Sequence, residues 1–315
     1  GELSGKDVKL INYLASHNHW TPFSHPQITI REEVPIFVAR QRFKHMIWFT
    51  YNEVSRRYVN DEPSFYKPVW RNKPEHSVKH LRWAGKYAAE KKPDVIIHIG
   101  DHWDMPSLSS YDVGKRSFEG RRYTKDIDAG IEGMEAFLEP IKAEQNRLKR
   151  NKDKQWRPRM VFTLGNHENR IERAIESDPK IDGLISYRDF QLEEMGWEVY
   201  PFLQPVIIDD IAYCHYFTSG VMGRPVSSAK LMLAKKYMSC IMGHVQDRDI
   251  AYARKADGTN IIGLFSGIYY QHDEDYLTPQ TNGSWSGIWL LNEVANGDCD
   301  ELPVSINYLR EKYGD

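Results

Sequence analysis

The hydrophobic pattern at the start of the chain predicts a helix, a strand and a second helix. Leucine and isoleucine recur at helical spacing in residues 8–16, whereas residues 26–33 alternate between apolar and polar positions as a strand does. Pro35 begins a further apolar stretch, which predicts a helix because proline is tolerated in the first helical turn. Residues 59–75 contain three prolines, mixed charge and no periodicity, so we expect a linker there.

After this linker the pattern alternates between helix and strand. Residues 77–92 have the amphipathic spacing of a helix, and residues 127–150 predict a long helix that Pro140 should break. We therefore expect an α/β fold that becomes richer in strands toward the C-terminus, with layered sheets and helices outside them. The predicted strands are residues 95–99, 160–164, 206–208, 211–215, 239–242, 261–265, 287–291 and 304–308. Between two of them, Asp209 and Asp210 predict a hairpin turn.

Composition and charge remove several functional classes from consideration. The formal net charge is -2, so no overall positive field favours nucleic acid or a membrane surface. No apolar run reaches membrane-spanning length and no signal-peptide pattern is present, so we expect a cytoplasmic protein without a membrane partner. The cysteines Cys214, Cys240 and Cys299 lie far apart, which argues against a disulfide framework and fits a reducing compartment.

Side chains suited to metal ions follow four of the predicted strands. Three apolar runs end in GDHWD (residues 100–104), GNHE (residues 165–168) and GHVQ (residues 243–246), and a fourth ends in His215. Strand ends of an α/β sheet converge on one edge, where such proteins place their ligands. Carboxylate, amide and imidazole groups suit Mn, Fe, Zn or Mg. The sequence therefore predicts a metal site at this edge.

The order of these blocks resembles the calcineurin-like metallophosphoesterase family. Its pattern is D-x-H, G-D-x-x-D, G-N-H-[ED], a single His and G-H-x-H, and residues 77–315 contain the last four in order. The resemblance implies a layered β-sandwich flanked by helices, and hydrolysis of a phosphate mono- or diester by a metal-activated hydroxide. The substrate stays open between a phosphorylated small molecule and a nucleic acid. The metal ligands it implies are Asp101, Asn166, His215, His244 and Gln246.

The same resemblance implies roles for individual side chains. Asp101 would bridge two metal ions and take part in catalysis. His167 would lie near the leaving group, as general acid or as a stabiliser of the phosphoryl oxygens. Asp104 would orient its neighbours from behind the ligands.

Two departures from the family pattern are visible. Gln246 occupies the place of the last histidine, and its amide oxygen is the weaker ligand. The D-x-H block is missing, and with it the first strand of the sheet. The nearest substitute is Glu75-His76, whose adjacent side chains would point to opposite faces of a strand. A metal-binding scaffold without turnover is therefore an alternative to an active phosphoesterase.

The N-terminal part resembles a different family. LINYLASHNHWTPFSH and the later PIFVARQRFKHMIWFTYNEVSRRYV are similar to the start of flavin-dependent thymidylate synthase (ThyX). The signature of that family is R-H-R, seven residues and then Ser. Here the place is taken by Lys44-His45-Met46, an eight-residue spacer and Ser55.

This second resemblance implies conversion of dUMP to dTMP with FAD as cofactor. The residues it places against FAD are Thr21, Lys44, His45 and Met46. Those it places against dUMP are Gln41, Arg42, Glu53, Ser55 and Arg57. Nothing after Tyr66 resembles the C-terminal half of that family. We therefore expect a partial ThyX-like segment of small α+β structure in residues 1–75 and a phosphoesterase domain in residues 76–315.

Overall fold

The computed structural model describes residues 4–17, 19, 39, 76–110, 119–270 and 284–314. The chain divides into two compact units, Gly1–Arg71 and Asn72–Asp315. In the first unit, α1 (Gly5–Ser16) confirms the predicted first helix. Its N-terminus is capped by Ser4, whose backbone N–H donates to the Asp7 carboxylate at 2.8 Å. The predicted strand at 26–33, the helix from Pro35 and the linker lie outside the described residues.

The second unit is mixed α/β, as the sequence predicts. Its helices are α4 (His76–Lys91), α5 (Tyr123–Asn151), α6 (Arg170–Ser177), α7 (Ala229–Lys236) and α8 (Ile306–Tyr313). The first strands are β1 (Val95–His98), β2 (Arg159–Thr163), β3 (Glu198–Tyr200), β4 (Val206–Ile208) and β5 (Ile211–Cys214). The remaining strands are β6 (Ser239–Met242), β7 (Arg248–Arg254), β8 (Asn260–Ser266), β9 (Gly287–Ala295) and β10 (Asp298–Ser305).

The described strands form three sheets. One is the parallel sheet β1-β2-β3, and another is the antiparallel pair β9-β10. The third has the order β4-β5-β6-β8-β7, and its central strands β5, β6 and β8 are parallel. Asp209 and Asp210, both with positive φ, form the predicted turn between β4 and β5. In both larger sheets the carboxyl ends of neighbouring parallel strands lie next to each other.

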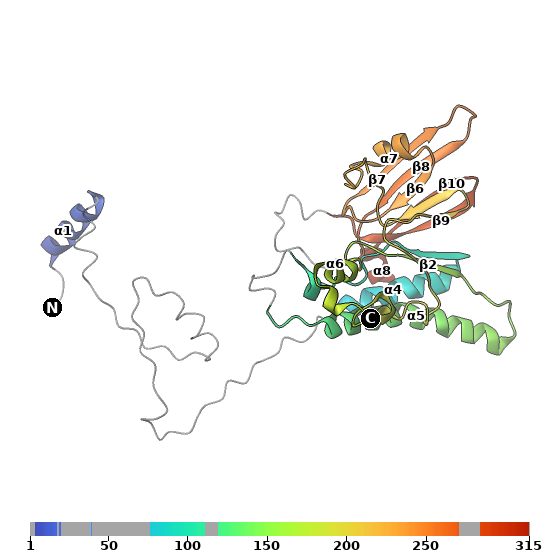
Figure 1. Cartoon of the computed structure of the whole chain (residues 1–315), viewed down its shortest axis with the longest axis horizontal. Coiled ribbons are helices and arrows are strands. Elements are labelled where there is room, and N and C mark those ends of the chain that lie inside the picture. The colour runs from blue at the N-terminus through green and yellow to red at the C-terminus, as the bar shows by residue number, and fades with distance from the viewer. Residues whose placement is uncertain are drawn as a thin grey trace, which may run out of the picture. The chain divides into compact units, whose positions relative to one another are not determined.

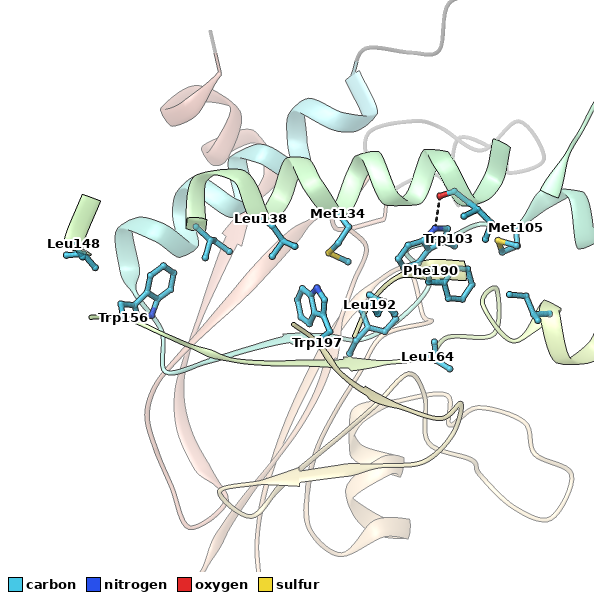
Figure 2. Packing of buried hydrophobic residues seen from close by; sticks show 14 residues of the cluster. Trp103, Met105, Met134, Leu138, Leu148, Trp156, Leu164, Phe190, Leu192 and Trp197 are labelled. Atoms are coloured by element: carbon cyan, nitrogen blue, oxygen red, sulfur yellow. Dashed lines mark hydrogen bonds between the residues drawn. The ribbon is translucent and has the colours of Figure 1, made fainter. Parts of the chain in front are cut away.

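Hydrophobic layers hold these sheets together. Figure 1 shows α4 and α5 beside the first sheet and α7 against the sheet that contains β6, β7 and β8, and α8 contacts α4, β9 and β10. Val161 of β2 belongs to one buried cluster with Ile211 of β5 and Leu264 of β8. The partly buried Trp289 of β9 packs against this cluster, so the three sheets share a core. A second cluster fills the space between α5 and the first sheet (Figure 2). None of the described helices has the length and apolar composition needed to cross a membrane.

The expected break at Pro140 is wrong. The helix α5 runs through Pro140 from Tyr123 to Asn151, although a proline inside a helix removes one backbone hydrogen bond. Packing against α4 explains this, because Gly85 of α4 brings its backbone close to the Phe137 carbonyl of α5. The long buried face of α5 therefore offsets the local cost of the proline. The predicted strand at 304–308 is wrong beyond Ser305, because Ser305 caps α8 and the chain is helical from Ile306. The strands β3 and β7 and most of β10 were not predicted, since they are short or half-exposed and weakly patterned.

Trp103 anchors the GDHWD turn beneath α5. Its indole is 1% exposed, and Nε1 donates to the Ile127 carbonyl at 3.2 Å (Figure 2). Space for the ring exists because position 130 is glycine; a Cβ there would overlap the indole. The aromatic ring also stacks on Phe190 with 4.4 Å between centroids. This packing fixes the turn whose other residues, Asp101 and Asp104, point toward the candidate site.

Candidate metal centre

Four side chains from four strand ends meet at one place. Asp101 follows β1, Asn166 follows β2, His215 follows β5 and His244 follows β6. The carboxylate of Asp101 and ring nitrogens of His215 and His244 all lie within 4.8 Å of one another, which is close enough to hold one metal ion. Asn166 joins them, because its Oδ1 lies 2.8 Å from His244 Nδ1.

The contacts of His215 fix which of its nitrogens faces the cluster without a proton. Nδ1 lies 2.7 Å from the Ile99 carbonyl oxygen, which only accepts, so Nδ1 carries the hydrogen. In the neutral ring, Nε2 then presents a lone pair. That atom lies 2.9 Å from Asn166 Oδ1 and 3.2 Å from His244 Nδ1. It also lies 3.2 Å from Asp101 Oδ2, so two oxygen acceptors and one ring nitrogen approach it.

The charge of Asp101 favours a cation among these side chains. Burial opposes ionisation of Asp101, yet contacts with His215 and His167 lower the pKa of Asp101 to about 2. Burial likewise opposes protonation of His215, but the hydrogen bond with Asp101 raises the pKa of this histidine. A proton on Nε2 is thus one way to neutralise the cluster. A carboxylate, an amide oxygen and two imidazoles are equally a donor set for a divalent transition metal, so the residues fit such an ion.

Two of the four residues adopt left-handed backbone. Asp101 has φ of 56° and His244 has φ of 64°, both in the left-handed region that few non-glycine residues adopt. The two side chains concerned are both members of the cluster. Strained backbone of this kind occurs at functional sites, where the surrounding structure imposes it.

His167 and Asp104 form a pair beside the cluster. His167 Nδ1 lies 2.6 Å from Asp104 Oδ1, and the His167 backbone N–H donates to Asp101 Oδ1 at 3.0 Å. Burial opposes protonation of the ring, but the hydrogen bond to Asp104 raises the pKa of His167. The same hydrogen bond lowers the pKa of Asp104. Arg170 completes the group, with Nη2 3.5 Å from His167 Nε2 and Nη1 donating to the Asp104 carbonyl oxygen at 2.7 Å.

Glu168 is the residue that sequence reasoning missed. Its side chain is fully buried, and it accepts hydrogen bonds from backbone N–H groups of both metal-site turns. Burial and then the charge of Asp101 raise the pKa of Glu168. The only sign of it in the sequence was its place at the end of GNHE. These hydrogen bonds are needed because burying a carboxylate without donors would be very costly.

Other predicted residues lie elsewhere. Gln246 is not joined to the cluster by any contact within the described part of the chain; its Oε1 accepts from Ser284 Oγ at 3.1 Å. His98, an ordinary residue of β1 and not a ligand candidate, stacks on Phe162 with 4.5 Å between centroids. The predicted FAD and dUMP residues lie outside the described residues; they are Thr21, Gln41, Arg42, Lys44, His45, Met46, Glu53, Ser55 and Arg57.

Comparison with known proteins bears on the N-terminal part. Residues 2–152 match the family described as Thymidylate synthase complementing protein. A flavin-dependent thymidylate synthase of Thermosipho africanus is 41% identical over 93 residues, which cover 29% of this chain and 40% of the relative. The flavin-dependent thymidylate synthase of Tropheryma whipplei strain TW08/27 is 44% identical over 116 residues, which cover 36% of this chain and 46% of the relative. The chain thus spans less than half the length of these relatives.

These matches confirm the similarity of the N-terminal part to flavin-dependent thymidylate synthases. The family match ends at residue 152, whereas the predicted resemblance ends at residue 75, so the matched range crosses from the first unit into the second. None of the matches named here is to a metallophosphoesterase, and that resemblance stays a prediction. No solved structure matches the chain.

Proposed function

We propose that the second unit hydrolyses phosphate esters with the help of a divalent metal ion. The observation that supports this most strongly is the convergence of Asp101, Asn166 and His244 on His215 Nε2. A carboxylate, an amide oxygen and two imidazoles that meet at the ends of separate strands form a donor set suited to a divalent transition metal ion.

The residues around the cluster have separable tasks in such a reaction. A bound divalent ion would supply Lewis acidity and lower the pKa of an attacking water. His167 would give a proton to the leaving oxygen from Nε2, while Asp104 holds the opposite nitrogen at 2.6 Å. Arg170 lies beside Nε2 and offers a guanidinium to an anionic phosphoryl oxygen. Asp101 and His215, whose facing atoms lie 3.2 Å apart, would be neighbouring ligands of the ion.

The missing D-x-H block limits what this site provides. The cluster supplies ligands for one ion, and the partners of a second would have been Asp and His of the absent block. We therefore propose one tightly held ion and slow turnover. A metal-binding scaffold without turnover is the non-enzymatic alternative, which metal content without hydrolysis would identify.

Hydrolysis of an activated aryl phosphodiester in the presence of Mn²⁺ tests the proposal. The full chain should release nitrophenolate from bis(p-nitrophenyl) phosphate, and Asp101→Ala should abolish this activity together with metal content. Glu176→Gln, an exposed change on α6, serves as the control. If the full chain neither binds Mn²⁺ nor exceeds the Asp101→Ala rate, the hydrolase proposal is wrong.

A second candidate function belongs to the N-terminal part. The family match over residues 2–152 and relatives named flavin-dependent thymidylate synthase support FAD binding and methylation of dUMP there. Lys44 and His45 would contact FAD, whereas Arg42 and Arg57 would pair with the dUMP phosphate.

Flavin binding tests this candidate directly. Purified chain mixed with FAD should quench flavin fluorescence, and dUMP should alter the flavin spectrum further. Arg57→Ala should remove the dUMP effect while FAD binding persists. A chain that leaves FAD fluorescence unchanged at saturating protein would rule the second candidate out.

A further inference from the structure

We infer that Glu168 is a positioning residue that clamps the two metal-site turns together and so sets the place of the Asp101 carboxylate. The inference rests on the proposed function, because it assigns Glu168 a task in holding the ion. Glu168 is not expected to contact substrate, and its effect passes through the backbone of its neighbours.

Four backbone N–H groups donate to the two oxygens of this carboxylate. Oε2 accepts from Asp101 at 2.8 Å and from Gly165 at 2.8 Å. Oε1 accepts from His102 at 2.6 Å and from Trp103 at 2.9 Å. Three donors come from the turn after β1 and one from the turn after β2, so one side chain joins the two strand ends.

The chemistry of the group matches this task closely. An ionised carboxylate offers about four lone-pair directions and no hydrogen, which equals the four donors present. An amide at this position would offer one oxygen and an NH₂ group that faces two N–H donors. Glu168 is 0% exposed, so water cannot replace a lost contact. The isosteric change to Gln should therefore release one pair of donors.

Close approach of the two turns makes the clamp necessary. A Cβ at Gly165 would overlap Asp101 Oδ1, and a Cβ at Gly100 would lie 2.5 Å from the Gly165 nitrogen. Asp101 itself has φ of 56°. Backbone in this conformation needs outside contacts to hold it. The backbone N–H of Asp101 donates to Glu168, and the Asp101 carboxylate lies 3.2 Å from His215 Nε2. Movement of the turn would therefore move a ligand of the ion.

Two measurements on Glu168→Gln test the inference. In the metal-free chain, hydrogen exchange at the amides of Asp101, His102, Trp103 and Gly165 should become faster than in the wild type. Calorimetric titration with Mn²⁺ should show a dissociation constant raised about 10–100-fold, the range seen when partners of metal ligands are changed. Saturating Mn²⁺ should restore much of the hydrolysis rate of Glu168→Gln, whereas His167→Ala should stay slow at any Mn²⁺ concentration.

Controls separate this inference from general damage to the fold. Glu176→Gln on α6 should match the wild type in exchange and in Mn²⁺ affinity. Glu168→Asp keeps the charge on a shorter side chain, and it serves if Glu168→Gln fails to fold. Its affinity for Mn²⁺ should still fall below that of the wild type, but by less than the roughly 10–100-fold expected for Glu168→Gln. Unchanged exchange and affinity in a folded Glu168→Gln would overturn the inference alone. A wild-type chain that binds no Mn²⁺ would overturn the proposed function and this inference with it.

Discussion

The Nδ1 atom of His167 and the Oδ1 atom of Asp104 lie 2.6 Å apart, although 63 residues separate them in the chain. The pair joins the turn after β2 to the turn after β1. It leaves His167 Nε2 directed away from Asp104, next to the guanidinium of Arg170. The orientation of one imidazole therefore depends on residues from two strand ends.

Removing the charge of Asp104 should slow hydrolysis without abolishing it. Asp104→Asn keeps an oxygen that can accept from His167 Nδ1, yet it loses the charge that favours a protonated imidazole. We expect a rate reduction of about 10–100-fold, as for other partners that orient catalytic groups. Initial rates on bis(p-nitrophenyl) phosphate measure it, with exposed Asp128→Asn of α5 as control. A rate equal to that of the wild type would show that the pair has no catalytic task.

Metal binding should stabilise the folded second unit. An ion that binds only the native state adds about 2.7 kcal/mol at one hundred times its dissociation constant. Thermal unfolding followed by circular dichroism should therefore show a higher midpoint with Mn²⁺, reversed by a chelator. His215→Ala should remove the increase, because Nε2 is the centre of the cluster. An equal increase in His215→Ala would place the Mn²⁺ elsewhere on the chain.

Gly85 should be intolerant of a side chain. A Cβ at this position in α4 would overlap the Phe137 carbonyl and lie 3.3 Å from Pro140 Cδ of α5. Gly85→Ala should therefore destabilise the fold by about 1–3 kcal/mol of overpacking, partly offset by about 1 kcal/mol of helix propensity. Urea unfolding measures the change. The control is Gly220→Ala, where no atom lies within 4 Å of the added Cβ. A more stable Gly85→Ala would contradict the close packing of α4 on α5.

The contact between α4 and α8 should weaken in acid. Hydrogen bonds from Lys312 and then Tyr313 lower the pKa of Glu90 to about 2, from an ordinary value of 4.5. Because the folded-state pKa is the lower one, the stabilisation is present above about pH 4.5 and is lost as the pH falls toward 2. Glu90→Gln should lower the thermal midpoint at pH 7, and the difference from wild type should shrink below pH 4.5.

A neighbouring carboxylate provides the control for Glu90. Glu311 lies on α8, is exposed, and has no ionic or hydrogen-bonded side-chain partner within the described part of the chain. Glu311→Gln should therefore leave the thermal midpoint near that of the wild type across the same pH range. A difference between Glu90→Gln and wild type that stays constant from pH 7 to pH 3 would contradict the assignment.

The sequence alone located most of the strands and identified the four side chains that meet at the candidate site. An apolar run followed by glycine and a polar residue is a local signal, so it can be recognised in the sequence as the end of a strand. Asp101, Asn166 and His244 follow such runs. The N-terminal similarity was also readable from contiguous residues. Neither required knowledge of which strands are neighbours.

Tertiary structure alone decided the rest. That α5 continues through Pro140 depends on α4, which lies far from it in sequence, and local propensity could not predict this. Glu168 was overlooked because its four donors come from positions 101, 102, 103 and 165, which only the folded chain brings together. The proton on His215 Nδ1 likewise depends on the Ile99 carbonyl, 116 residues away. Pattern determines which groups are available, whereas packing determines which atoms they face.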